Sequence, residues 1–419
     1  MRGPLTFLLL VLSLAFSSQL LTRVYRFPEP VPFSGPRVYN PYENADFSPG
    51  GWKKANFHGH SRSWLGLTAG RGISPEAYRQ GYLRLGYDIF QISDYMAIRP
   101  AGDPSHPSHP YVPCYEHGYG LTKSHQLCIG ASRVDWLEFP LFQTLHHKQT
   151  VLDRLRRSSD LVAIAHPLFG GGYRAEDFRY LDGYDLVEIL NDQYFSGPAW
   201  DSALSSGHAK FLVAGDDLHE LGRMFEIGVC STFVNARRAD RAGIVAALRS
   251  GNAYGVDLPA IPGDDLDLKA ARLRDLPRLA GFALSGDTLR VVLSGAAARF
   301  RFVGQGGREL KAAPGGLEAS YMMGPDDTYV RTEILFGGGA KIYLNPVFRY
   351  SGDDPLRPRM PEERPWASAL LKAALALAWL AAAYVAVSRS ARSLRRLAKS
   401  ARSPRSGGHV EPRPLSRPR

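Results

Sequence analysis

The sequence predicts an α/β domain, then a small all-β domain, then a C-terminal membrane-spanning helix. From Gly51 to Asp257, short apolar runs alternate with helical segments, a pattern typical of a mostly parallel sheet or an α/β barrel. From Gly281 to Tyr350, strand-like runs follow one another with glycine-containing turns, which favours a sandwich. Residues 366–388 are apolar except for one lysine and have the length of a membrane span.

The first 50 residues divide into two parts. Residues 1–22 are nearly all apolar, which is typical of a signal peptide or of an uncleaved membrane anchor, and both interpretations stay open. Residues 23–50 contain six prolines. Proline fixes φ and removes a hydrogen-bond donor, so this part is predicted to be an extended linker or a strap over the next domain.

Residues 51–257 form the predicted α/β domain. One helix opens at Ser74, a capping residue followed by proline and glutamate, and two more cover 143–157 and 240–250, the last closed by Gly251. The apolar runs between these helices predict strands at 87–93, 161–165, 186–190 and 210–214.

Residues 258–352 form the predicted β-rich domain. Alternating runs at 288–293, 300–303 and 329–335 indicate its strands. The charge lies beyond it: residues 389–419 carry ten Lys or Arg and one Glu, whereas the rest of the chain has 41 basic and 39 acidic residues. The near-neutral main part gives no reason to expect nucleic-acid binding.

The basic tail sets the predicted topology. Positive charge directly after a span favours the cytoplasmic side, so the tail is predicted to be cytoplasmic and disordered, and the main part extracytoplasmic. A buried core helix at 366–388 and a nucleic-acid role for the tail are the alternatives. Cys114 and Cys128 could form a disulfide outside the cytoplasm, or all three cysteines could be buried free thiols.

Possible metal ligands stand at the ends of the predicted strands. Alternate side chains of a strand share a face, so His58 and His60 project together, and imidazole is a common metal ligand. In α/β folds the active residues lie at the carboxyl ends of strands. The other candidates in chain order are Asp94, Glu116, His125, His166, Asp217 and His219.

This series resembles the PHP (polymerase and histidinol phosphatase) superfamily over residues 52–257. The motifs that carry the resemblance are His58-Gly59-His60, Ile92-Ser93-Asp94-Tyr95, the acid Glu116, His125, Ala165-His166-Pro167 and Gly215-Asp216-Asp217-Leu218-His219. The segment 246–254 also resembles the helix that ends such domains. The β-rich part ends in a way that resembles modules found after some of them.

The resemblance implies a distorted (β/α)7 barrel that holds two or three divalent ions and, as in many members of the family, hydrolyses phosphoesters. Glu116 would bridge two ions, with His58, His60, His166 and Asp217 completing the primary shells. Asp94, His125 and His219 would also be ligands, the latter two in a second or third site, and Glu116, Asp217 and His219 would take part in catalysis. The nitrogen and oxygen ligands suit Zn, Mn or Fe.

Two departures from the family pattern bear on the third ion. Tyr95 stands where the family usually has histidine, and the loop 61–68 lacks the family's Asp-Gly. A binuclear site is therefore the prediction. The cationic side chains that could hold a substrate phosphate are Arg62, Arg71, Lys123 and Arg223.

The sequence thus favours a membrane-anchored, extracytoplasmic, metal-dependent phosphoester hydrolase. One alternative is a degenerate PHP domain that serves as a binding or sensory module at the cell surface. Another is a metal hydrolase that acts on a non-phosphate bond.

Overall fold

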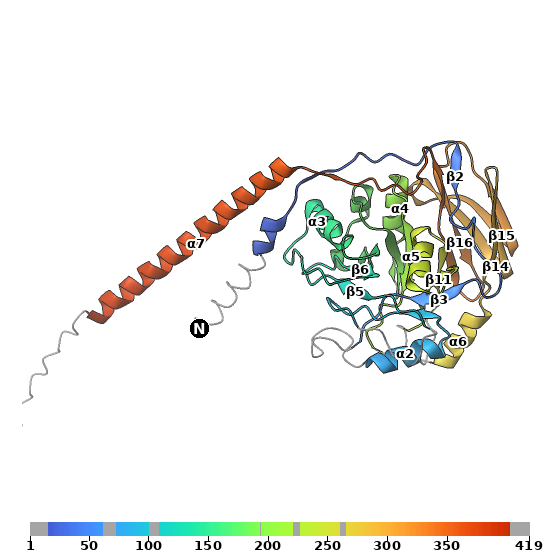
Figure 1. Cartoon of the computed structure of the whole chain (residues 1–419), viewed down its shortest axis with the longest axis horizontal. Helices are drawn as coiled ribbons and strands as arrows, with labels where there is room; N and C mark the ends of the chain where they lie inside the picture. The colour runs from blue at the N-terminus through green and yellow to red at the C-terminus, as the bar shows by residue number, and fades with distance from the viewer. Residues whose placement is uncertain are drawn as a thin grey trace, which may run out of the picture. The chain divides into compact units, whose positions relative to one another are not determined.

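The computed structural model describes residues 16–61, 73–99, 109–192, 194–220, 227–259 and 265–402 (Figure 1). The chain divides into two units, Met1–Pro365, named the body here, and Trp366–Arg419. Each unit is described by itself. The body combines two larger sheets with helices, so the fold is mixed α/β.

One sheet of the body has six strands in the order β10-β8-β7-β6-β5, with β9 paired to β8. Strands β7, β8 and β10 run parallel, whereas β5, β6 and β7 pair antiparallel. Every residue of β7, β8 and β10 is buried, as expected for parallel strands covered on both faces. The strands are β5 (Cys114–His117), β6 (Gln126–Ile129), β7 (Leu161–Ile164), β8 (Leu186–Asn191), β9 (Tyr194–Phe195) and β10 (Phe211–Gly215).

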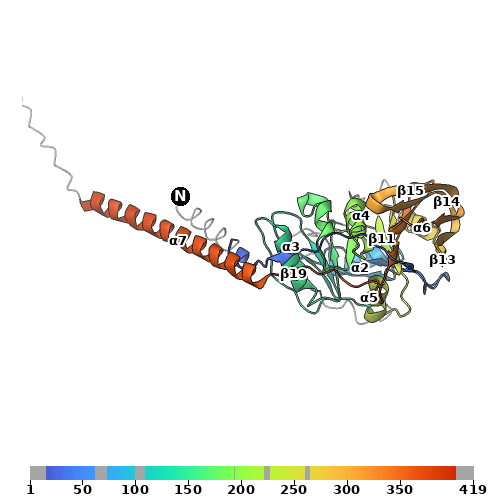
Figure 2. The same cartoon turned by 90° about the horizontal axis from the view of Figure 1, so that it is seen from above.

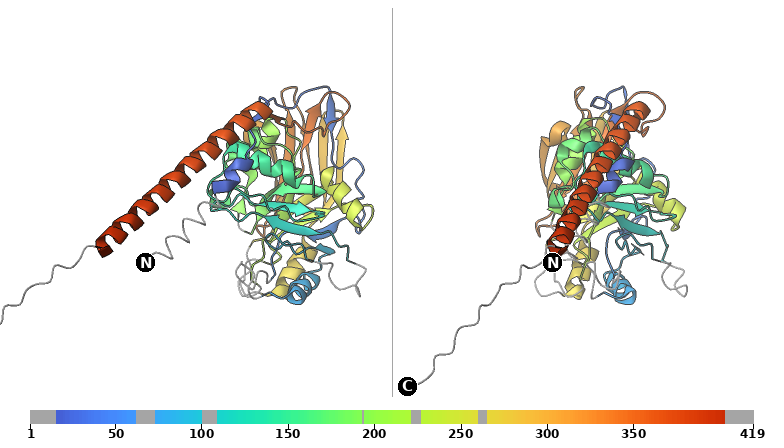
Figure 3. Two further views of the ribbon diagram at one scale, coloured as in Figure 1. Left: turned by 60° about the vertical axis from the view of Figure 1, so that its left-hand side comes forward. Right: turned by 90° about the vertical axis from the view of Figure 1, so that its left-hand side faces the viewer.

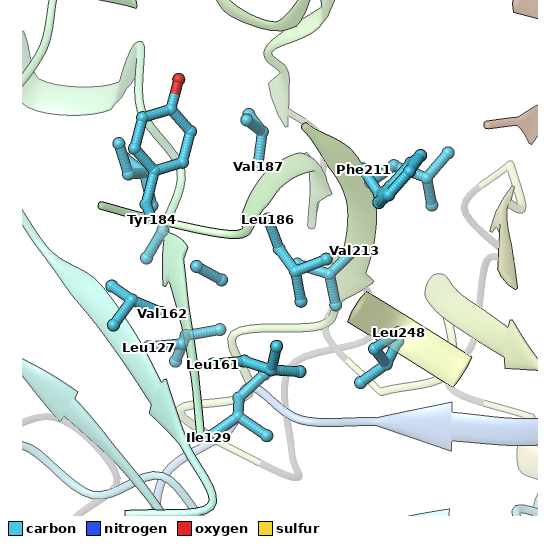
Figure 4. Packing of buried hydrophobic residues seen from close by; sticks show 14 of the residues in the cluster. Leu127, Ile129, Leu161, Val162, Tyr184, Leu186, Val187, Phe211, Val213 and Leu248 are labelled. Atoms are coloured by element: carbon cyan, nitrogen blue, oxygen red, sulfur yellow. The ribbon is translucent and has the colours of Figure 1, made fainter. Parts of the chain in front are cut away.

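The core of this region is built from the apolar runs that the sequence marks as strands. Leu127, Leu161, Val187 and Val213 pack together there, and Leu248 of helix α5 (Arg241–Arg249) is buried in the same cluster (Figure 4). Burying such a side chain contributes about 1.5–3 kcal/mol. The three cysteines lie buried as free thiols, so the disulfide alternative is not what the structure has.

The second sheet has eleven strands in the order β13-β14-β16-β17-β12-β11-β3-β4, with β15 on β14, β18 on β16 and β2 on β18. The strands are β2 (Arg37–Tyr39), β3 (Lys53–Asn56), β4 (Ile89–Phe90), β11 (Cys230–Val234), β12 (Ala253–Asp257), β13 (Leu279–Ser285), β14 (Thr288–Gly304), β15 (Arg308–Met322), β16 (Tyr329–Leu335), β17 (Lys341–Leu344) and β18 (Val347–Tyr350).

This sheet runs through both parts that the sequence analysis separates at residue 257. Strand β12 pairs with β17, with Tyr254 opposite Leu344. The β-rich strands β13, β14 and β15 gather at one end of the body, away from helix α3 (Leu145–Leu155) (Figure 2). They extend the eleven-stranded sheet, and β14 is one strand where the sequence predicts two.

The predicted (β/α)7 barrel is not shown. Among the described residues the strands belong to separate sheets, and no closed barrel is present. The physical reason lies in the pairing of the strands that follow β10. Strand β11 pairs antiparallel with both β12 and β3, and β3 pairs with β4, so all four strands belong to the second sheet. Two isolated parallel bridges, Tyr95↔Glu116 and Gly59↔Leu218, still connect the two larger sheets at one end.

Several helices begin at capping side chains, and the sequence predicts one of these caps, Ser74. The Ser74 side chain accepts a hydrogen bond from the Ala77 amide at the start of α2 (Pro75–Arg84), and Asp240 caps α5 in the same way. Helix α3 has a capping box of Thr144 and His147. Two helices were not predicted from the sequence. They are α4 (Gly197–Ser205) and α6 (Leu266–Asp275). The short 3-10 segments are η1 (Ser18–Leu21), η3 (Phe169–Gly171), η4 (Ala175–Arg179) and η5 (Gln305–Gly307).

Helices α2 and α6 lie side by side at the edge of the body (Figure 3). Arg84 and Asp267 join them with an exposed ion pair of 2.7 Å. Because α6 comes from the segment after residue 257, this is a second place where the two predicted domains meet.

The proline-rich residues 23–50 form a strap that packs on the body. Tyr42 is fully buried, its hydroxyl donates to the Ala253 carbonyl, and the Asn345 amide donates to that hydroxyl. The strap begins with β1 (Tyr25–Arg26), which pairs with β19 (Glu362–Glu363). The first and last strands of the body therefore lie together.

The second unit contains helix α7 (Pro365–Arg402). Its part Pro365–Arg389 is long and apolar enough to cross a membrane, judged by length and composition. The helix continues to Arg402, into the tail that the composition predicts to be disordered, because Ala, Leu, Arg and Lys are good helix formers. Most of the predicted N-terminal anchor or signal peptide and residues 403–419 lie outside the described residues.

Candidate metal centre

The predicted ligands meet where the two larger sheets come together. His58 and His60 follow β3, Glu116 lies on β5, His166 follows β7 and Asp217 follows β10. Backbone hydrogen bonds fix these strand ends, since the His60 amide donates to the Leu218 carbonyl (2.7 Å) and the Asp217 amide to the His58 carbonyl (3.1 Å). The cluster thus depends on the parallel course of β3, β7 and β10, whose carboxyl ends point the same way.

A first ligand group consists of His58, His60, Glu116 and Asp217. The Nε2 atoms of His58 and His60 lie 3.1 and 3.0 Å from Asp217 Oδ1, and 3.4 and 3.1 Å from Glu116 Oε2. Four ligands at about 2.0–2.1 Å from a tetrahedral ion are roughly 3.3 Å apart. The spacing of the four atoms therefore fits one divalent ion.

A second ligand group consists of Glu116, His125 and His166. Glu116 Oε1 lies 2.7 Å from His125 Nδ1 and 3.1 Å from His166 Nε2. Asp217 Oδ2 is 4.0 Å from His166 Nε2 and stands at the edge of this group. Glu116 belongs to both groups and turns one oxygen toward each.

Some buried polar atoms of the candidate centre have no hydrogen-bond partner but are placed to bind a metal ion. Among the described residues, His58 Nε2 and Glu116 Oε2 are buried without a hydrogen-bond partner. A buried polar group without a partner costs about 1–3 kcal/mol. A cation between these atoms would remove that cost, so the residues present fit a divalent ion.

Glu188 supports the first group, and the sequence analysis missed it. Its Oε1 lies 2.8 Å from His58 Nδ1, while its Oε2 accepts hydrogen bonds from the His166 amide (2.8 Å) and from Asn191 (2.9 Å). A proton on His58 Nδ1 leaves Nε2 with its lone pair toward the ligand group. The signal was a single carboxylate inside the apolar run of β8.

Asp216 is the second functional residue that sequence reasoning missed. Its carboxylate accepts hydrogen bonds from the amides of Gly228, Val229 and Cys230 and from the Tyr82 hydroxyl, at 2.8–2.9 Å. It ties the end of β10 to the start of β11. Its neighbour Asp217 is held in place by these contacts.

The carboxylates determine the protonation of the metal-free histidines. Burial alone would lower the pKa of His58, but Asp217, Glu188 and Glu116 raise that pKa well above its usual value. Burial also opposes protonation of His60, yet the nearby carboxylates of Asp217 and Glu116 raise its pKa to about 9. Burial raises the pKa of Glu116, but His125 and His58 outweigh it and hold that pKa well below the usual range.

Two of the ligands have a backbone conformation that side chains other than glycine rarely adopt. His166 has φ +26° and Asp217 has φ +50°. Such conformations cost of order 1 kcal/mol or more and cluster at functional sites. The strand ends are thus bent to aim these side chains at Glu116.

The remaining predicted ligands lie beside the two groups. Asp94 accepts hydrogen bonds from the Ser61 amide (2.7 Å) and hydroxyl (2.9 Å) and pairs with Arg99, and it belongs to neither group. The His219 ring stacks on His60 at 4.5 Å, and its Nε2 lies 3.3 Å from Asp217. Tyr95 also stacks on His60 at 4.5 Å.

Of the predicted phosphate-binding cations, Lys123 is exposed on the loop that precedes His125. Arg62, Arg71 and Arg223 lie outside the described residues. The structure therefore brings the ligands of the two groups together. Among the four predicted phosphate-binding cations, Lys123 is the one that lies in the described part of the chain.

No family model matches the chain, and no curated protein matches it. A solved structure to which it is similar is the crystal structure of a two-domain protein from Bacteroides vulgatus that contains a predicted PHP-like metal-dependent phosphoesterase. The identity is 14% and the TM-score 0.35, over 77% of this chain and 99% of that chain. The functional assignment therefore depends on the ligand geometry described above.

Proposed function

We propose that this chain is a membrane-anchored hydrolase that uses two divalent ions to cleave phosphoesters outside the cytoplasm. The observation that carries the proposal is Glu116, which turns one carboxylate oxygen to each of two ligand groups. A carboxylate in this position would hold two ions close together. Mixed nitrogen and oxygen ligands suit Zn, Mn or Fe.

The two ligand groups and His219 have separate roles in this proposal. His58, His60, Glu116 and Asp217 would hold one ion, and Glu116, His125 and His166 the other. Two bound ions supply a lower pKa for water and charge stabilisation for the phosphoryl oxygens. We assign His219, beside Asp217 and stacked on His60, to orient the attacking water.

The reaction is a hydrolysis. The water oxygen bonds to phosphorus, the ester P–O bond breaks, and the departing alkoxide takes up the proton that the water releases. Lys123, exposed on the loop before His125, is the cation available to hold the phosphate or the rest of the substrate. Glu188 keeps His58 in the required orientation throughout.

The membrane placement rests on α7 and the charge that follows it. The segment Pro365–Arg389 can span a bilayer, and the tail beyond it is basic, which favours the cytoplasmic side for the tail. Protease added to intact cells is expected to digest the body and to spare an epitope placed after Arg419. Digestion of the epitope together with the body would overturn this topology.

The activity is tested with the full-length chain in detergent. Metal content is measured, and turnover is screened with sugar phosphates, nucleotides, lipid head groups and non-phosphate esters. His166→Ala is expected to lose metal and phosphoester turnover, whereas His109→Ala, outside both ligand groups, keeps both. A chain that binds no transition metal, or equal turnover by both variants, would overturn the proposal. Turnover of only non-phosphate esters would point to the other hydrolase class.

A second candidate function follows from Tyr95. It stands where the resembled family usually has histidine, and its ring packs on His60 inside the centre. A centre altered in this way suits a binding or sensory module at the cell surface. Turnover of a phosphoester that disappears in Asp217→Asn would exclude this candidate.

A further inference from the structure

Several exposed apolar side chains lie on the loop between Glu116 and His125, on the segment between β6 and α3, and just after His166. We name them the apolar rim, and its members are Tyr119, Leu121, Trp136, Phe142 and Leu168. Leu121 is 79% exposed, and Trp136 and Phe142 are each more than half exposed. Soluble proteins commonly expose single apolar residues, but a group of them indicates a contact surface.

The loops of the rim are held together. The Tyr119 hydroxyl donates to the Trp136 carbonyl (2.9 Å), and the Leu121 amide donates to the Pro140 carbonyl (2.7 Å). The loop after His166 is connected to the loop before His125, because the Ser124 hydroxyl donates a hydrogen bond to the Gly172 carbonyl (2.9 Å). The rim is thus one surface built from three loops.

This surface borders the ligands directly. Residues 118–124 connect Glu116 on β5 to His125 before β6, and Leu168 follows His166 by two residues. The neighbouring Phe169 ring lies 5.7 Å from the His166 ring. Whatever rests on the rim therefore lies next to the second ligand group.

The rim is also connected to the strand pair of β1 and β19 in the body. Helix α3 starts three residues after Phe142, and His146 in its first turn accepts a hydrogen bond from the Tyr25 amide (3.2 Å). Tyr25 pairs with Glu363 of β19, two residues before Pro365. The first turn of α3 thus connects the rim to the strand pair of β1 and β19 (β19 and α3 in Figure 2).

The chemistry of the rim suits a bilayer surface. Trp and Tyr have an apolar ring with a polar tip and are enriched where hydrocarbon meets headgroups. Lys123 is exposed on the same loop as Leu121, and a lysine near a bilayer is attracted to anionic headgroups. An aqueous substrate gives no reason for exposed apolar side chains beside the ligand groups.

We propose that the apolar rim rests on the membrane that holds α7, and that the metal centre hydrolyses phosphoester headgroups of lipids in that membrane. This inference rests on the proposed function. The rim and Lys123 bring the headgroup to the ligands, and the acyl chains stay in the bilayer. Water attacks phosphorus, the P–O bond to the departing alcohol breaks, and that alcohol takes up the proton of the water.

The membrane contact is tested without any activity. The native cysteines are buried, so Leu121→Cys offers one accessible thiol for an environment-sensitive fluorophore. Leu317→Cys is the matched control, because Leu317 is 57% exposed on β15 in the β-rich part. In vesicles that contain the full-length chain, lipids with a nitroxide quencher are expected to quench the label at 121 and not at 317. Equal quenching at both positions would overturn the contact.

The substrate class is tested with matched pairs of substrates. Phosphatidate in vesicles is compared with glycerol phosphate, and phosphatidylglycerol with glycerophosphoglycerol. We expect the acylated member of a pair to be hydrolysed at least tenfold faster. Leu121→Asp should lower the ratio of acylated to deacylated rates severalfold, and Leu317→Asp should leave both rates unchanged.

The outcomes separate the two proposals. Turnover of deacylated phosphoesters at rates equal to those of the lipids overturns the lipid inference and leaves the hydrolase function standing. Turnover of no phosphoester overturns the function and the substrate class, while the quenching at 121 still decides the membrane contact. A ratio that Leu121→Asp leaves unchanged removes the rim from substrate selection.

Discussion

Glu188 Oε1 lies 2.8 Å from Nδ1 of His58, and neither side chain is exposed to solvent. The pair orients the imidazole, so Nε2 of His58 points to Glu116 and Asp217. A carboxylate behind a ligating histidine fixes its tautomer and raises its basicity. The candidate metal centre therefore depends on a residue that belongs to neither ligand group.

Glu188→Gln is expected to weaken metal binding about 10- to 100-fold, because the amide keeps the shape but loses the charge behind His58. Competition with a fluorescent chelator measures the affinity. Glu138→Gln is the control, since Glu138 is also a buried carboxylate but belongs to neither ligand group. An affinity unchanged by Glu188→Gln would contradict the assigned role.

The number of bound ions distinguishes the ligands. His125→Ala removes a ligand of the second group only, so the metal content should fall from two ions to one. Glu116→Gln affects both groups and should lower the content further. Elemental analysis or native mass spectrometry provides the counts. Two ions retained in His125→Ala would mean that the second group is not a site.

Metal binding should become tighter as the pH rises. The metal-free His60 has a pKa of about 9, above its usual value, so at pH 7 it holds a proton that an ion must displace. Each displaced proton changes the affinity about tenfold per pH unit below that pKa. Calorimetry in buffers of different ionisation enthalpy measures the released protons. Binding without proton release at pH 7 would disagree with this expectation.

Tyr95→Phe should leave the metal content unchanged, because the ring that stacks on His60 is retained and Tyr95 belongs to neither ligand group. Tyr350→Phe, at the end of β18, is the control. Loss of one ion from Tyr95→Phe alone would identify the phenol as a ligand and would reopen the question of a third site.

Asp201 and Arg331 form a buried ion pair between α4 and β16, with a second contact from the Tyr329 hydroxyl to Asp201 (2.9 Å). Asp201→Ala leaves the guanidinium buried beside one fewer carboxylate and should lower the free energy of unfolding by about 3–5 kcal/mol. Glu318→Ala breaks the exposed pair with Arg290 and should cost about 0–1 kcal/mol. Denaturant unfolding measures both values. Similar losses for the two variants would show that burial of the first pair has little effect.

The sequence predicts those features that follow from local periodicity. The residues after β3, β7 and β10 could be named because a strand end aims alternate side chains at one edge of a sheet, as for His58 and His60. The capping residue Ser74 likewise marked a helix start through its own side chain. These signals need no knowledge of distant segments.

Long-range pairing could not be predicted in the same way. Glu188 stands in an apolar run, and only its distance to His58, 130 residues earlier in the chain, gives it a role. The pairing of β12 with β17 joins segments on both sides of residue 257, where the change of pattern suggested a boundary. Antiparallel pairing of β11 with β3 also determines that the strands lie in two sheets.

The pairing of β1 with β19 brings the first and last strands of the body together, and it involves only two residues of each strand. A single short attachment of this kind fixes the position of the body but not its orientation. If α7 spans a bilayer as proposed, this pairing alone would leave the body able to rotate relative to that bilayer. A second contact at the apolar rim would restrict that rotation, so the side chains beside the ligand groups would determine the orientation of the body.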